Sequence, residues 1–374
     1  MVMATPQPQS EPVVAEEVLG EPAVPIGPDP HRRSASRPRP VRIVIGAVLL
    51  VAGVVCLLLG TTLLATEVVM GARVALTLLG VALAYLGVSR LVRAIVGDRT
   101  DVAYWLSVVW LVLLVGTALL APVLPLGEAS NTAATLTDPI LARPDIPSEY
   151  PLGTNKLGLD LFARAIYGAR VSLVVSLVAA AIGLVIGGAF GLVAGYMKRW
   201  TDTAIGIVTN VLLAFPPLVL LLALAAVLPR NVRNQALALG LIVIPVNVRL
   251  ARAMAMSFSE REFVLAAQAI GAKRRSIMVR ELLPNVLVPL LSYGFIVIAV
   301  LIVAEASLSF LGLGIPPPEP TWGNMIAEGQ NGQFEDTPHL VLVPAVFLFL
   351  TVLSFNLVGE RLRLRWAGGK QVEL

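Results

Sequence analysis

Charged residues are scarce in this sequence. Lysine, arginine, aspartate and glutamate together make up 14% of the 374 residues, whereas hydrophobic residues make up 57%. The mean hydropathy is +0.83. A typical soluble domain has about 25% charged residues, so this composition excludes an ordinary soluble protein. It predicts a polytopic membrane protein, for which we expect an all-α fold.

Cysteine and histidine are almost absent. The single cysteine, Cys56, lies in an apolar stretch and cannot form a disulfide within the chain, so we expect it to be a small packing residue. The two histidines, His31 and His339, are far apart, and neither has a cysteine or a cluster of carboxylates beside it. The sequence therefore predicts no metal site and no catalytic residue, and we do not expect the chain to be an enzyme.

A phosphate-binding loop is also missing. None of the four lysines, Lys156, Lys198, Lys273 and Lys370, follows the Gly-x-x-x-x-Gly pattern that cradles nucleotide phosphates. We therefore expect no cofactor on this chain. If the protein takes part in ATP-driven transport, ATP and Mg²⁺ must bind to another subunit.

Residues 1–40 are rich in proline, serine, glutamate and alanine and have no apolar periodicity. Their charge changes from acidic, around Glu16 and Glu17, to basic, around Arg32 and Arg33. Such a segment cannot bury enough apolar surface to become ordered, and it lacks the layout of a cleaved secretory signal. It is predicted to be a disordered cytosolic tail whose basic end lies against anionic headgroups.

Long apolar runs recur after residue 40. Crossing about 30 Å of hydrocarbon takes roughly 20 apolar residues in a helix. Eight segments meet this length, at residues 42–65, 72–96, 103–123, 168–196, 203–228, 233–255, 285–312 and 339–359. The sixth is the least apolar, because Pro245, Asn247, Arg249 and Arg252 interrupt it.

Basic residues predict how the spans are oriented. If both termini are cytosolic, the clusters at residues 32–42, 90–99, 198–199, 249–280 and 361–365 all lie on the cytosolic face, as the positive-inside rule requires. We therefore expect two N-terminal helices in residues 41–100, a main transmembrane domain in residues 101–365 and a cytosolic tail at residues 366–374.

Two external segments are expected, at residues 124–167 and 313–338. In the first, Leu157, Leu161, Phe162 and Ile166 predict an amphipathic helix at the membrane interface. In the second, the proline run at residues 316–318 is predicted to be a solvated loop. The Trp-Gly-Asn stretch at residues 322–324 is expected to help cap the external mouth of the bundle instead.

Residues 256–284, between two spans, are polar, charged and helix-forming, in contrast to the apolar segments on either side. Ser259, followed three residues later by Glu262, is a capping-box pattern and predicts the start of a helix. Gly271 is placed to end that helix in the left-handed conformation. A second short helix is then expected, closed by Pro284. The segment is either a basic cytosolic loop or a helix, bend and helix that contacts a soluble partner.

The order of residues in this stretch resembles the EAA loop of ABC-transporter permeases, through which such subunits dock on their ATPase. The matching residues are Ala266, Ala267, Gly271, Ile277 and Pro284. The glutamate that opens the family signature is Leu265 here, so no salt bridge is expected from that position.

The resemblance extends from about residue 150 to 365 and points to the dipeptide, oligopeptide and nickel branch of ABC importers. The matching pieces are PLGT at 151–154 with Asp160, YGAR at 167–170, AFPP at 214–217, AEASLSFLGLG at 304–314, WGNM at 322–325 and FNL at 355–357. Asn155 and Leu159 depart from the external motif, where an acid and a base are usual. Together, the order and spacing of these pieces are specific to that branch.

This resemblance implies a six-span permease core preceded by two additional N-terminal spans, in the bacterial plasma membrane. It implies half of a translocation pathway for di- or oligopeptides or a related small solute. The expected partners are a homologous second permease, two ATPase subunits or a fused pair, an external solute-binding protein and the lipid bilayer; no nucleic acid is expected.

The resemblance also assigns candidate site residues. Those expected to couple to the ATPase are Glu262, Ala266, Ala267, Gly271, Arg274, Ile277 and Pro284. Pathway or structural roles are implied for Pro216, Pro217 and the intramembrane carboxylate Glu305. The external motif residues are Gly153, Thr154, Asp160, Trp322 and Asn324.

Two other classes of function stay open. An ion-coupled secondary transporter is the main alternative, although intramembrane carboxylates are nearly absent and no inverted hydropathy repeat is visible. A membrane scaffold that transports nothing is the third hypothesis. Uptake that depends on a partner ATPase would separate the first hypothesis from both.

Overall fold

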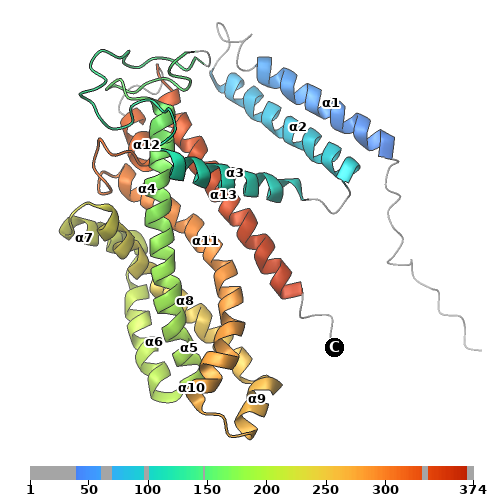
Figure 1. Ribbon diagram of the computed structural model, residues 1–374, viewed down its shortest axis with the longest axis vertical. Helices are drawn as coiled ribbons and strands as arrows, with labels where there is room; N and C mark the ends of the chain where they lie inside the picture. The colour runs from blue at the N-terminus through green and yellow to red at the C-terminus, as the bar shows by residue number, and fades with distance from the viewer. Residues whose placement is uncertain (1–38, 60–69, 97–100, 146–147, 331–335, 369–374) are drawn as a thin grey trace, which may run out of the picture. The chain divides into compact units, whose positions relative to one another are not determined.

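The computed structural model describes residues 39–59, 70–96, 101–145, 148–330 and 336–368 (Figure 1). These residues are helical over most of their length, and the β-structure among them is an isolated bridge between Thr154 and Asp160. The predicted all-α fold is confirmed. The predicted disordered tail lies outside the described residues, except for its last two, which begin the first helix. The chain divides into two units, Met1–Asp98 and Arg99–Leu374.

The first unit contains a pair of packed helices, α1 (Arg39–Leu58) and α2 (Met70–Val96). Glycines seven residues apart line their contact, Gly46 and Gly53 on α1 and Gly80 and Gly87 on α2. A Cβ atom at Gly53 would lie only 2.4 Å from the backbone nitrogen of Ala84. Small residues let helix backbones approach closely where lipid provides no hydrophobic drive for association.

The second unit holds the remaining helices. In chain order they are α3 (Val102–Leu120), α4 (Leu161–Ile182), the π-helical turn η2 (Gly183–Gly187), α5 (Gly188–Met197), α6 (Arg199–Ala214), α7 (Pro217–Val227), α8 (Val232–Ser259), α9 (Glu262–Ala269), α10 (Arg274–Ser276), the π-helical turn η3 (Ile277–Leu282), α11 (Leu283–Phe310), α12 (Trp322–Gln330) and α13 (His339–Gly368). The first three residues of the predicted C-terminal tail continue α13.

Six helical stretches among the described residues are long and apolar enough to cross a membrane. They are Ala75–Ile95, Val102–Leu120, Leu161–Met197, Val232–Ser259, Arg274–Phe310 and His339–Trp366. The first predicted span, 42–65, holds a shorter apolar helix over Ile43–Leu58. The fifth predicted span, 203–228, contains two helices, α6 and α7, which meet at an angle of 84°. They would count as one further span if the bent pair crosses together.

The fourth span begins earlier than predicted. Asp160 caps α4, and its carboxylate accepts the backbone N–H groups of Phe162 and Ala163. Leu161 and Ile166 are buried in the bundle. The predicted interfacial helix is therefore the first two turns of a membrane span, since its apolar residues face other helices instead of lipid.

A line of glycines joins α4, η2 and α5 to α8. Gly183, Gly187, Gly191 and Gly195 recur every fourth residue, so they fall on one side of the helix. A Cβ atom at Gly191 would lie 2.5 Å from the Val248 carbonyl oxygen, and one at Gly195 would lie 2.6 Å from that of Arg252. These glycines therefore serve close packing between the two helices.

The main hydrophobic core of the second unit lies between α4, α8 and α11, and α3, α7 and α13 pack around it. A second cluster lies where α9, η3 and the start of α11 meet α5 and α8. Within this unit α9 and α12 lie at opposite ends of the helical bundle (Figure 1). The segments that the sequence singled out as coupling and external therefore lie at opposite ends.

Candidate functional site

The stretch at residues 256–284 forms a helix and a sharp bend, as the sequence predicted. Gly271 has a φ of +83°, a conformation that L side chains rarely adopt. No other heavy atom lies within 4 Å of the place that a Cβ atom would occupy there. Glycine is required at this position by its backbone conformation and not by crowding.

Two details of the predicted motif are wrong. Ser259 ends α8 instead of capping α9, and its hydroxyl donates to the Met256 carbonyl oxygen at 2.7 Å. Helix α8 continues to Ser259, four residues beyond the end of the predicted apolar span at residue 255. The expected second short helix is continuous with the following span over Arg274–Phe310. Pro284 lies inside this continuous stretch, directly after the π-helical turn η3, a type of irregularity that accompanies proline within helices.

One side of α9 is held in the bundle. Val264, Ile277 and Leu282 are almost completely buried and share a cluster with residues of α5, α8 and α11. Most of the other residues of α9 are exposed, and apolar side chains are among them: Leu265 is 52% exposed, and Ile270, which directly follows the helix, is 86% exposed. Apolar groups exposed together on a fixed helix are typical of a surface that another protein covers.

The predicted coupling residues divide between buried and exposed positions. Ile277 is buried and Ala267 is half-buried, so they hold the segment in place. Glu262, Ala266, Gly271, Arg274 and Pro284 are exposed. Beside them a hollow of about 740 Å³ separates the turn between α5 and α6 from α9 and α10, and its lining includes Lys198, Arg199 and Arg274.

The predicted intramembrane carboxylate, Glu305 of α11, is completely buried. It accepts hydrogen bonds from Ser172 of α4 at 2.8 Å, from Ser309 of its own helix at 2.7 Å and from Gln235 of α8 at 3.5 Å. A buried carboxylate without donors is very costly. Its contacts therefore hold α4, α8 and α11 together, and this favours the structural role over a pathway role for Glu305.

The predicted proline kink is a break in the helix. Phe215 and Pro216 have extended backbone angles, and Pro217 starts α7. Two contacts along α6 tie it to α8. Asp202, in the first turn of α6, pairs with both nitrogens on one edge of the Arg252 guanidinium, and Asn210 accepts from Arg249 at 2.9 Å. The two arginines that weakened the sixth predicted span thus have partners on α6.

The external motif residues meet at the start of α4. Gly153, with a φ of +85°, makes the turn, and its carbonyl oxygen accepts the Leu161 N–H. The Thr154 hydroxyl accepts the Ala142 N–H at 3.0 Å. Burial raises the pKa of the Asp160 carboxyl, although the hydrogen bonds from Phe162 and Ala163 lower it. All three residues are buried, so they fix the loop and are not a surface site.

Trp322 and Asn324 organise the second external segment. The Trp322 indole is fully buried and donates to the Ala165 carbonyl oxygen of α4 at 3.0 Å. Asn324 accepts the Thr321 N–H and donates to the Glu319 carbonyl oxygen. The expectation that this stretch is packed is confirmed. The proline run at residues 316–318 is exposed, as predicted.

Comparison with known proteins identifies the family. A family model described as "Binding-protein-dependent transport system inner membrane component" matches residues 187–366. The dipeptide transport system permease protein DppC of Alkalihalophilus pseudofirmus is 36% identical over 259 residues, which cover 69% of this chain and 84% of the relative. The chain belongs to this family of ABC-transporter permeases.

Other relatives agree with this assignment. The glutathione transport system permease protein GsiD of Pectobacterium atrosepticum is 36% identical over 58% of this chain and 71% of its own length. A putative peptide transport system permease protein of Brucella suis is 34% identical over 70% of this chain and 86% of its own length. The predicted resemblance is confirmed, and this permease is a membrane-embedded transport subunit and not an enzyme.

The sequence did not single out two polar contacts of the permease. Arg164 of α4 is buried and pairs with Glu328 of α12, and Gln235 joins the Glu305 cluster. An acid and a base that pair from distant parts of the chain leave no recognisable pattern in the local sequence. Glu305 could be recognised because it interrupts an apolar run.

Proposed function

We propose that this permease forms half of the translocation pathway of an ATP-driven importer of di- or oligopeptides. A homologous second permease forms the other half, and an external solute-binding protein delivers the cargo. ATP and Mg²⁺ bind to two separate ATPase subunits or a fused pair. The relatives described above are permeases of dipeptide, glutathione and peptide transport systems, which supports a peptide or a closely related small solute as cargo.

The observation that carries the ATPase contact is the exposed side of α9. Leu265 and Ile270 are exposed while Val264 is buried, so the helix is fixed on the bundle and offers apolar side chains to a partner. Lys273, Arg274 and Arg275 follow the bend and are exposed. A partner with an apolar cleft and an acidic rim fits this surface, because Leu265 removes the usual glutamate.

The side of the membrane follows from the same proposal. The segment around α9 is cytosolic, both termini are cytosolic, and residues 124–160 and 313–338 are external. The basic residues at 198–199, 249–252 and 273–280 support this orientation, because positively charged loops stay in the cytosol.

Crosslinking tests the proposed contact. Ile270→Cys, in a Cys56→Ala background, is expected to crosslink to the ATPase subunit in the assembled transporter. Leu136→Cys is the matched control, because Leu136 is 84% exposed and Ile270 is 86% exposed. The control should give no ATPase crosslink, and an impermeant thiol reagent should label it from outside intact cells. External labelling of the Ile270 variant would contradict the proposal.

Uptake measurements separate the two kinds of transporter. Peptide uptake should stop when the partner ATPase is catalytically inactive and should continue when the proton gradient is collapsed while ATP is maintained. The reverse result would favour an ion-coupled secondary transporter.

A further inference from the structure

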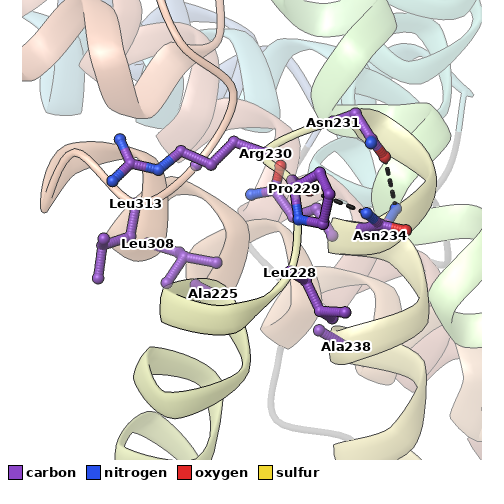
Figure 2. A pocket seen from close by; sticks show the side chains of 11 residues that line it. Ala225, Leu228, Pro229, Arg230, Asn231, Asn234, Ala238, Leu308 and Leu313 are labelled. Atoms are coloured by element: carbon purple, nitrogen blue, oxygen red, sulfur yellow. Dashed lines mark hydrogen bonds between the residues drawn. The ribbon is translucent and has the colours of Figure 1, made fainter.

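A small cavity lies where α7, α8 and α11 meet. Figure 2 shows its walls: Ala225 and Leu228 at the end of α7, Arg230 and Asn231 in the following turn, Ala238 of α8 and Leu308 of α11. Gln235 also lines it. The cavity offers about 20 Å³ to water. One buried water molecule requires roughly 10–15 Å³ by that measure, so a single molecule fits and a larger ligand does not.

An unpaired acceptor lines this cavity. Gln235 is only 6% exposed, and its side-chain oxygen, Oε1, has no hydrogen-bond partner among the described residues. The nitrogen of the same amide, Nε2, donates to Glu305 Oε1 at 3.5 Å. Rotating the Gln235 amide by 180° would not provide Oε1 with a donor, because it would place this oxygen against the Glu305 carboxylate. Gln235 therefore needs a hydrogen-bond donor from the cavity side.

The neighbouring polar groups already bond one another. Asn231 Oδ1 accepts the Asn234 N–H at 2.9 Å, and the Asn234 side chain donates to the Pro229 carbonyl oxygen at 2.9 Å (Figure 2). Arg230 donates to the Gly312 carbonyl oxygen at 2.8 Å. These bonds close the α7–α8 turn over the cavity, but none of them reaches Gln235 Oε1.

We propose that one water molecule occupies this cavity and donates a hydrogen bond to Gln235 Oε1. The water keeps the Gln235 amide oriented with Nε2 toward Glu305, so the carboxylate retains its donor from α8. Water, Gln235, Glu305, Ser172 and Ser309 then form one buried hydrogen-bonded unit. Through it the first turns of α8, which carry Gln235, are linked to α4 and α11. This site does not depend on the cargo or on the ATPase.

A high-resolution map of the assembled transporter tests the water directly. It should contain a density peak within hydrogen-bond distance of Gln235 Oε1. An empty cavity, or a protein group bonded to that oxygen, would overturn the proposal.

A double-mutant cycle tests the same site in solution. Gln235→Met removes the amide, and Ala238→Val fills the space for the water. Each should speed hydrogen exchange at the start of α8 by about tenfold, the order expected for one lost buried hydrogen bond. The double variant should exchange no faster than Gln235→Met alone, because without the amide no group needs the water.

Additive effects in that cycle would show that Ala238→Val acts only by overpacking, and they would overturn the proposal. Leu237→Met is the matched control, because Leu237 lies on the same helix and is 48% exposed. It should leave the exchange rates of α8 unchanged.

Discussion

The Arg164 guanidinium of α4 pairs with the Glu328 carboxylate of α12, and one guanidinium nitrogen, Nη2, lies 2.9 and 3.1 Å from the two carboxylate oxygens. Arg164 also donates to the carbonyl oxygens of Ala129 and Pro318. A single buried arginine thus joins both external segments to the first turn of a membrane span. The external cap is consequently one connected structure.

Breaking this pair should destabilise the permease strongly. Glu328→Ala leaves Arg164 buried without its counterion and should lower the free energy of unfolding by about 3 kcal/mol, the lower end of the range for a broken buried pair. Replacing both residues with methionine should recover most of that loss, because no buried charge remains. Thermal unfolding of the purified transporter measures both. A double variant less stable than Glu328→Ala would contradict this account.

Two serines of α11 should respond differently to alanine. Ser309 donates to Glu305 at 2.7 Å, whereas Ser307 donates to the Val303 carbonyl oxygen of its own helix. Ser309→Ala removes a donor from a fully buried carboxylate and should cost about 1–3 kcal/mol. Ser307→Ala should change stability by less than about 0.5 kcal/mol. Equal shifts in the unfolding midpoint would mean that Glu305 does not depend on Ser309.

Gly271→Val should weaken ATPase docking. A β-branched residue resists a φ of +83°, so the bend would open and α9 would shift. Co-purification of the ATPase with the variant permease should fall well below the wild-type yield. Gly271→Asn should retain more binding, since asparagine tolerates this conformation better.

Gly116→Ala is a control for glycine replacement as such. Gly116 also has free space around it but lies within α3 with ordinary helical angles. Alanine there should leave co-purification unchanged. Wild-type ATPase recovery with Gly271→Val would mean that the bend is not required for docking.

Asp160→Asn should change how stability depends on pH. Burial raises the pKa of Asp160 above its ordinary value of 3.8. The stabilising contribution of the protonated carboxyl is therefore fully present below that ordinary value and is lost as pH rises through the raised pKa. Asparagine still caps the helix but does not titrate.

As pH rises from the ordinary value of 3.8 through the raised pKa of Asp160, wild-type permease should therefore lose stability relative to the Asp160→Asn variant. Thermal unfolding midpoints across this range measure the difference. A constant difference between the two proteins would show that Asp160 does not titrate there.

The sequence predicted the parts of the fold that apolar length and local backbone chemistry determine. Six spans followed from hydrophobic runs, and the positive φ of Gly271 followed from its place after a helical pattern. The break at Pro216 and Pro217 was seen as a kink, but its angle depends on what α7 packs against. The prediction that Ser259 caps α9 was wrong, because a capping-box pattern can also occur where a long preceding helix ends.

The polar contacts between helices were less predictable. Glu305 stands out in an apolar run, yet its donors Ser172 and Gln235 lie 133 and 70 residues away in the sequence. Small polar residues in spans are common, and only the packing of α4, α8 and α11 selects these two. The pairs of Arg164 with Glu328 and of Arg252 with Asp202 could not be predicted either, because helix packing also determines which residues pair there.

The glycine line along α4, η2 and α5 has a mechanical consequence. A Cβ atom added at Gly187, Gly191 or Gly195 would lie 2.5–2.7 Å from atoms of α8, so this line sets how closely α5 and α8 approach. Small sliding motions of packed helices are one way in which proteins rearrange. A slide of α8 could keep this close contact, but it would have to move Gly240 past the Ile182 side chain that packs against it.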